Sequence, residues 1–365
     1  MLSPKKFCLF PKTNRDQGLM NSIKKVLGII FAALFVLTAV PALIFFNFDR
    51  RAFTVVTYQS AFANADFYNK LPVIMAQSIS SPGSAASQDM LTSQLEMNQN
   101  TWETFFRTLL SPEDLKTIGT GLLDSTFAYI NMQSDTVQLP MTPIKTRMDS
   151  DAGVQSALVI FNTLPKCTAE QIEQMTLDAL SNKNQTQPCG LPEKYNVLLL
   201  PLIRDLMKSA ALELPDQMIM YSSTASLEND PRIKLRSART AMRLSPILPL
   251  LFLLLMSFFT VNSLKNWLRW WGVPLFITGL FTSLAGLGGT PTFEAFFKEI
   301  FVNELPGYLQ NWVNELVSII LKALFNPILW QGLIIIFIGL IMIVSSYFVS
   351  RREKQQTPQT IQSGT

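Results

Sequence analysis

The sequence predicts an all-α membrane protein, with four transmembrane helices and a mainly helical extracytoplasmic domain inserted between spans 1 and 2. Charged residues make up only 15% of its 365 residues, whereas a soluble domain has about 25%. The deficit is concentrated in four uncharged stretches, each long enough to cross a bilayer, which takes about 20 apolar residues. A hydrophobic content of 48% excludes a disordered chain.

The four uncharged stretches are the predicted spans, and they comprise residues 26–48, 244–264, 270–293 and 327–350. A cleaved signal peptide is the alternative for the first stretch, but the apolar part of a signal peptide has only about 7–15 residues. The first stretch is longer than this and runs into Phe46-Asn47-Phe48-Asp49, so we expect an uncleaved anchor.

The distribution of Lys and Arg over the short connecting segments predicts the orientation of the spans. Residues 1–25 form a basic arm with six Lys or Arg residues, the turn at 265–269 has two, and the tail at 351–365 has three. The segment 294–326 is longer and has only two. We therefore expect a multi-pass protein of the plasma membrane, with both termini in the cytoplasm and residues 49–243 outside.

Short helices with clear start signals are predicted within this outer insert. Ser111-Pro112-Glu113-Asp114 is typical of a helix start, because it combines an N-cap, a first-turn proline and acids at the positive end of the helix dipole. Thr168 and Gln171 have the spacing of a capping box. The expected helices are 50–78, 112–131, 151–163, 169–180, 192–213 and 231–243. Two short stretches, Thr136–Met141 and Gln217–Tyr221, are expected to pair as a small ribbon.

Two of the three cysteines, Cys167 and Cys189, lie in loop-like settings within the insert. A disulfide between them in an oxidising compartment would stabilise the domain by about 3 kcal/mol. Free buried thiols and a redox pair are the alternatives. The chain has no CxxC spacing, and two cysteines without any histidine do not make a zinc site. We therefore expect a structural disulfide.

A stripe of four arginines precedes the second span. Arg232, Arg236, Arg239 and Arg243 recur at helical spacing, so they share one face of a helix. No acid occurs between residues 232 and 264. One interpretation is that acids elsewhere in the insert neutralise the stripe. The other is a binding site for anionic lipid or for a membrane-protein partner, because each basic residue beside a membrane contributes about 1 kcal/mol.

The segment 294–326 carries a second candidate binding surface, which is aromatic. It is expected to form two amphipathic helices that are broken at Pro306-Gly307. Its candidate binding residues are Phe296, Phe297, Phe301 and Trp312. This segment has three possible roles: it lies on the outer leaflet, packs beneath the insert, or docks another protein.

Motifs for catalysis are missing from the sequence. Histidine is absent, which removes the commonest general base and metal ligand. Asp149-Ser150-Asp151 resembles the start of a calcium loop, but the distal acidic ligands are missing, so helix capping explains it better. Gly286-Leu287-Gly288-Gly289 follows no strand and, with Gly279 and Ser283, is expected to form a small-residue face for helix packing. We assign no catalytic, cofactor or metal residue and expect no cofactor and no nucleic-acid partner.

One loose resemblance rests on residues of the insert. Leu110-Ser111-Pro112-Glu113, Leu164-Pro165-Lys166-Cys167 and Pro188-Cys189 resemble a group of uncharacterised bacterial multi-pass membrane proteins with a Cys-containing helical extracytoplasmic insert between the first two spans. The resemblance covers about residues 100–195. It implies a bacterial cytoplasmic membrane and no particular activity.

These patterns together favour a non-catalytic integral membrane protein. We expect an envelope scaffold or accessory subunit whose outer domain binds a protein partner or an anionic lipid surface. The alternative is a transport or channel component for an apolar or lipid-like substrate, because the spans contain no ion-coupling charge.

Overall fold

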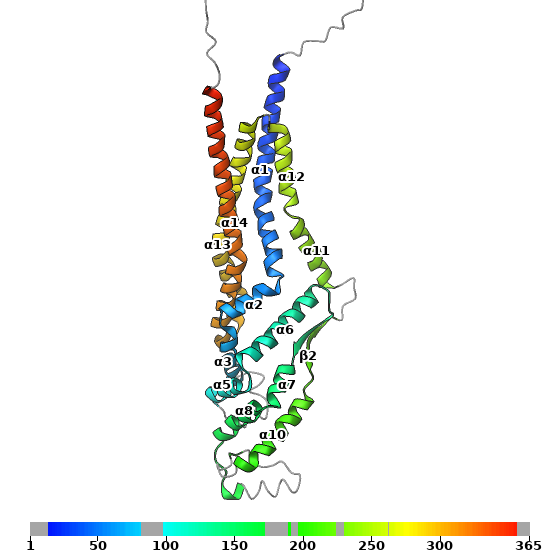
Figure 1. The fold of residues 1–365 in the computed structure, drawn as a ribbon, viewed down its shortest axis with the longest axis vertical. Helices are drawn as coiled ribbons and strands as arrows, with labels where there is room; N and C mark the ends of the chain where they lie inside the picture. The colour runs from blue at the N-terminus through cyan, green and yellow to red at the C-terminus, as the bar shows by residue number, and fades with distance from the viewer. Residues whose placement is uncertain are drawn as a thin grey trace, which may run out of the picture. The chain divides into compact units, whose positions relative to one another are not determined.

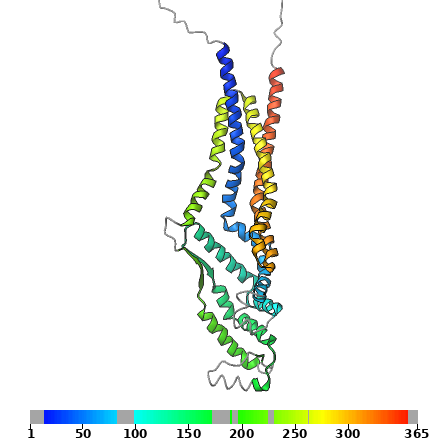
Figure 2. The same ribbon diagram turned by 180° about the vertical axis from the view of Figure 1, so that it is seen from behind.

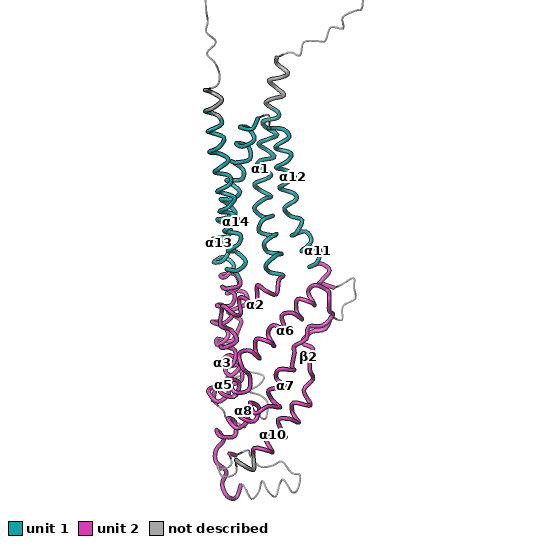
Figure 3. The backbone as a smooth tube through the Cα atoms, viewed as in Figure 1, with its two compact units in different colours: residues 1–53, 235–293, 321–365 teal, residues 54–234, 294–320 magenta. Residues whose placement is uncertain are grey.

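A computed structural model of the protein describes residues 14–81, 98–171, 189–190, 196–223, 230–261 and 263–355 (Figure 1). The chain forms two compact units (Figure 3). Unit 1 consists of residues 1–53, 235–293 and 321–365, and unit 2 consists of residues 54–234 and 294–320. Each unit collects segments that are distant in the sequence.

Four helical segments are long and apolar enough to cross a membrane, which confirms the predicted number of spans. They are Ile23–Ala52, Pro231–Thr260, Leu264–Glu304 and Gly307–Val349. The helices that build them are α1 (Asn14–Ala52), α11 (Pro231–Leu244), α12 (Ile247–Thr260), α13 (Leu264–Ile300) and α14 (Gly307–Gln355). The break between α11 and α12 falls at Ser245-Pro246, because proline has no backbone N–H to donate.

Two of the expected element boundaries differ from the structure. The segment 294–326 is no separate pair of helices: its halves continue α13 and α14, and only the predicted break before Gly307 is confirmed. Pro291 and Pro327 lie inside these helices without ending them. The expected helix 50–78 is also interrupted, since α1 ends at Ala52 and Asp66 adopts a left-handed conformation with φ 51°.

Glycines repeat every seven residues where α13 and α14 run side by side (Figures 1 and 2). They are Gly272, Gly279 and Gly286 on α13, and Gly332 and Gly339 on α14. A Cβ at Gly279 would lie 2.6 Å from the Ile336 amide nitrogen, and one at Gly339 would lie 2.6 Å from that of Phe276. The two backbones are therefore as close as small residues allow. Gly288, expected on this face, instead meets open space.

Unit 2 contains the helices of the insert and a short ribbon. Its elements are α2 (Val55–Asn64), α3 (Phe67–Ser80), α5 (Gln99–Leu109), α6 (Pro112–Ile130), β1 (Thr136–Pro140), α7 (Thr142–Met148), α8 (Asp151–Thr163), α10 (Asn196–Glu213) and β2 (Gln217–Ser222). Its core is a cluster of buried apolar side chains that includes Tyr68, Leu109, Leu115, Val154 and Ile203. Because these residues come from five helices, the insert has a hydrophobic core of its own.

The predicted helix start at Ser111 is confirmed, and within Asp149-Ser150-Asp151 the capping residue is Ser150. Ser111 and Asp114 form a reciprocal capping box at the start of α6, and the Arg147 guanidinium donates to the same Asp114 carboxylate at 2.6 Å. Burial alone would raise the pKa of Asp114, but the hydrogen bonds from Ser111 and Arg147 outweigh it and lower the pKa. Ser150 caps α8 by accepting a hydrogen bond from the Ala152 amide.

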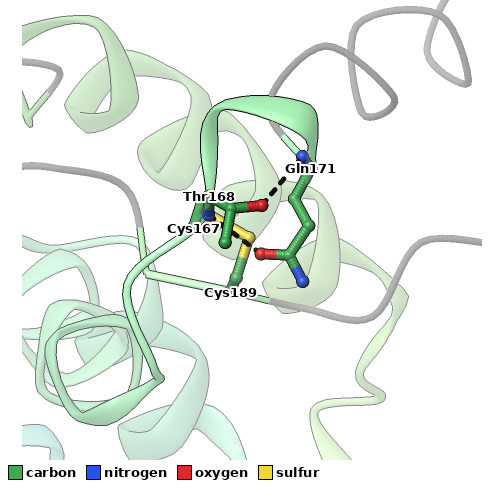
Figure 4. The surroundings of a disulfide bond; sticks show 4 residues. All are labelled: Cys167, Thr168, Gln171 and Cys189. Carbon is green, nitrogen blue, oxygen red and sulfur yellow. Dashed lines mark hydrogen bonds between the residues drawn. A yellow bond between two sulfur atoms is a disulfide. The ribbon is translucent and has the colours of Figure 1, made fainter.

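The structure joins Cys167 to Cys189, with a Cα–Cα distance of 5.0 Å (Figure 4). Beside the disulfide, the Cys167 amide donates to the Gly190 carbonyl at 3.0 Å. Thr168 and Gln171 form the expected capping box, with hydrogen bonds of 2.9 and 3.3 Å. Residues 172–180 of the helix expected there, like Cys8, lie outside the described residues.

The contrast between Gly279 and Gly288 yields a test of the close helix contact. Gly279→Ala is expected to destabilise the protein by about 1–3 kcal/mol, because the added methyl group has no room. Gly288→Ala is the matched control, and it is expected to be neutral or to stabilise by up to about 1 kcal/mol, because alanine favours a helix. Thermal unfolding in detergent measures both variants. Equal effects of the two substitutions would contradict the close contact.

A second test concerns Asp114, whose pKa is lowered in the folded protein. Its ionised carboxylate therefore stabilises the fold at pH values above the ordinary pKa of an aspartate side chain. This contribution is lost as the pH falls through the lowered pKa. Asp114→Asn is expected to cost about 1 kcal/mol at about pH 7 and much less at about pH 3. The control is Asp124→Asn, at an exposed position on the same helix. Thermal unfolding at both pH values measures the difference, and a cost independent of pH would refute the proposed ionic contribution.

Candidate functional site

The clearest candidate surface is the ribbon of β1 and β2 in unit 2. The two strands pair antiparallel, as predicted, from Thr136 opposite Ser222 to Pro140 opposite Gln217. The register shifts after Val137, so that Met220 is an extra residue on β2. Such a bulge bends and twists the strand that carries it.

Hydrogen bonds hold the ribbon at both ends and along one edge. The Met141 amide donates to the Asp216 carbonyl at 2.9 Å, and the Ser223 amide donates to the Asp135 carbonyl at 3.0 Å. On β1, the Gln138 amide donates to the Ser125 hydroxyl of α6 at 2.7 Å. The edge of β1 is thus covered by α6, and the ribbon is fixed to the core of unit 2.

The second strand, β2, is exposed along its whole length. Met218, Ile219, Met220 and Tyr221 are 50–60% exposed, and they point to both faces of the ribbon. In the described part of the chain, no third strand pairs with β2. An exposed apolar edge strand is a template for pairing with another chain, and methionine is common at adaptable binding surfaces. Our sequence reasoning missed this surface, although four consecutive apolar residues without polar alternation were a signal of it.

Arg232, the first arginine of the stripe, fixes the ribbon instead of facing a ligand. Its guanidinium pairs with Asp230 at 2.6 Å and with Asp135 at 2.9 Å, and it lies 4.5 Å from the Tyr129 ring centroid. It also donates to the Ser134 carbonyl at 2.9 Å. The hydrogen bonds from Arg232 lower the pKa of Asp230. Arg232 thereby joins the start of α11 to the chain just before β1.

The next arginines of the stripe lie in unit 1, where two of them share one buried acid. Arg239 and Arg243 donate to the two carboxylate oxygens of Asp49 on α1, at 3.1 and 2.7 Å. The Asp49 side chain is only 3% exposed. Arg236 is exposed and has no ion pair among the described residues. The interpretation that acids elsewhere neutralise the stripe therefore holds for three of its four members, although Asp49 comes from the end of α1.

The aromatic candidate surface is only partly exposed. Phe296 and Phe301 are 54% and 56% exposed, whereas Phe297 and Trp312 are half-buried. Within unit 2, Lys70 of α3 lies 4.9 Å from the centroid of the Trp312 ring and pairs with Glu315 at 3.0 Å. These contacts support packing against the insert, one of the three roles considered for this segment. Binding of a partner by these aromatic residues stays a prediction.

The sequence analysis did not predict a polar pair in unit 1, which joins Asn47 of α1 to Gln331 of α14. The two side-chain amides donate to each other, at 2.7 and 3.0 Å. Asn47 also donates to the Leu43 carbonyl at 2.7 Å. Because each amide both donates to the other and accepts from it, the pair is suited to joining α1 to α14.

Comparisons of this chain with protein-family models, with curated proteins and with solved structures found no match. The resemblance to bacterial multi-pass membrane proteins therefore stays a prediction.

The different surroundings of Arg232 and Arg236 lead to a prediction. Arg232→Gln is expected to destabilise the ribbon and to increase hydrogen exchange in residues 216–223, because it leaves the Asp230 carboxylate buried without its cation. Arg236→Gln, the matched control on the same helix face, is expected to leave exchange unchanged. Hydrogen–deuterium exchange of the full-length protein in detergent measures both. Similar exchange in the two variants would show that Arg232 does not hold the ribbon.

Proposed function

We propose that this protein is a non-catalytic integral membrane protein, an envelope scaffold or accessory subunit, whose insert binds a protein partner. The exposed apolar edge of β2 carries this proposal, because no third strand of the described chain pairs with it and the ribbon is fixed on its other side. The partner adds an extended strand to this edge, and Met218, Ile219 and Tyr221 contact its side chains. Binding of an anionic lipid surface by the arginine stripe is less favoured, because three of its members have acidic partners.

The proposed location is the plasma membrane, with both termini in the cytoplasm and the insert outside. The basic residues of the arm, the short turn and the tail support this orientation. The disulfide supports it as well, because the outer side is the oxidising side. The absence of histidine from the sequence supports a role in binding over one in catalysis.

A second candidate function is transport of an apolar or lipid-like substrate. It is favoured by an apolar cavity of about 210 Å³ within unit 1, which α1, α12, α13 and α14 line. Phe35, Ala39, Leu253 and Leu275 are among its lining residues. Its volume is below the usual range of ligand pockets, about 300–1,000 Å³, and we therefore rank this function second.

Site-specific crosslinking tests the proposed partner-binding function. A photoreactive amino acid at Ile219 is expected to give a crosslinked product of one defined mass in intact cells. The same residue at Leu212, which is 74% exposed on α10, is the matched control and is expected to give none. Charge on β2, introduced with Met218→Lys, is expected to abolish the product.

Two outcomes of the crosslinking experiment would contradict the proposal. Equal labelling at Ile219 and Leu212 would show unspecific contact. The absence of a product at Ile219, in cells where the protein is folded and inserted, would favour the second candidate function. A product with twice the mass of this chain would identify the partner as a second copy.

A further inference from the structure

Unit 1 contains a large open cavity at the end of the bundle where the basic arm enters it. Its volume is about 790 Å³, and it is lined by residues between Lys24 and Ala32 of α1, the end of α12 and the first turns of α13. The first turns of α13 belong to the segment that our orientation places at the cytoplasmic surface. The cavity is far along the sequence from β2 and shares no lining residue with the proposed partner-binding surface.

Three cations lie on the rim of this cavity. They are Lys24 and Lys25 on α1 and Arg269 on α13. All three are exposed, and in the described part of the chain none of them forms an ion pair. Asn266 adds an uncharged hydrogen-bonding group to the rim. The rim is therefore positively charged, and no acid among the described residues pairs with it, which favours an anion.

Apart from Thr260, the remaining wall of the cavity is apolar and aromatic. Ile29, Phe259, Trp270 and Val273 contribute to it, and Val273 is 42% exposed. Tryptophan rings are typical of the interface between lipid headgroups and hydrocarbon. A soluble anion such as free phosphate would leave this wall without a partner. The combination of cations and apolar wall favours an amphipathic ligand.

The same helices continue from this wall to the smaller apolar cavity. On α1, Ile29 lines the first cavity and Ala39 lines the second, and ten residues of helix correspond to about 15 Å. On α13, Pro274 lines the first cavity and Leu275 lines the second. An acyl chain that starts at the basic rim therefore has an apolar path along α1 toward the middle of the span.

We propose that this cavity binds one anionic phospholipid of the cytoplasmic leaflet. Lys24, Lys25 and Arg269 bind the phosphate of the headgroup, Trp270 and Phe259 contact the glycerol region, and one acyl chain follows α1 to Ala39. Basic pockets between membrane helices on the cytoplasmic side recognise anionic headgroups by this chemistry. The site is independent of partner binding at β2.

Native mass spectrometry of the full-length protein in mild detergent tests this site. The probes are phosphatidylglycerol, which is anionic, and phosphatidylcholine, which is zwitterionic. The wild-type protein is expected to prefer phosphatidylglycerol by about tenfold or more. The triple variant Lys24→Gln, Lys25→Gln, Arg269→Gln is expected to lose this preference. A control triple variant, Lys116→Gln, Lys208→Gln, Lys234→Gln, removes the same charge from exposed positions elsewhere, outside the arginine stripe, and is expected to keep it.

Two further measurements separate a lipid from a free phosphate. Val273→Trp is expected to weaken binding of both lipids, because the larger ring fills the apolar part of the cavity. Soluble glycerol phosphate is expected not to displace bound phosphatidylglycerol. Displacement by glycerol phosphate, an unchanged preference in the rim variant, or an equal loss in the control variant would each overturn the proposal. Crosslinking at Ile219 should be the same in all variants, so failure of this site is distinguishable from failure of the proposed function.

Discussion

Polar side chains in the bundle of unit 1 depend on partners inside the protein, because hydrocarbon offers them none. Asn47 and Gln331 satisfy this constraint by pairing with each other, and Asp49 satisfies it with the two arginines of α11. The hydroxyl of Ser257 accepts a hydrogen bond from the Trp271 ring at 2.6 Å. Thr278, Thr282 and Ser283 are exceptions on α13, because their buried hydroxyls have no hydrogen-bond partner among the described residues.

The same constraint explains why the arginine stripe is divided between two tasks. A carboxylate as buried as Asp49 needs cations, and the stripe provides two of them at successive turns of one helix. Asp230 needs a cation as well, and Arg232 occupies that position while it holds the ribbon. A row of basic residues next to a span thus has a structural use, and the exposed members alone remain for binding. The surface that we propose for a partner is instead the apolar strand β2.

Much of the local structure could be predicted from the sequence, because the signals are local. Ser111 with Asp114 and Thr168 with Gln171 are caps whose partners lie three residues away, and both form. The ribbon was also predictable, since Thr136–Pro140 and Gln217–Ser222 are bounded by turn residues. Helix ends were less predictable: the fourth span was expected to begin at Pro327, but Pro327 lies inside a long helix, where proline removes one hydrogen bond that the surrounding helix tolerates.

The sequence by itself determined that four apolar helices exist, where the cysteines lie and which arginines share a helix face, because composition and periodicity are properties of the chain. Only the tertiary structure decided which acids neutralise Arg232, Arg239 and Arg243, since Asp135 and Asp49 are about 100 and 190 residues away from them. It also decided that β2 stays exposed while β1 is covered, and that Lys24, Lys25 and Arg269 surround one cavity. These outcomes depend on which segments meet in space, and a linear pattern does not carry that information.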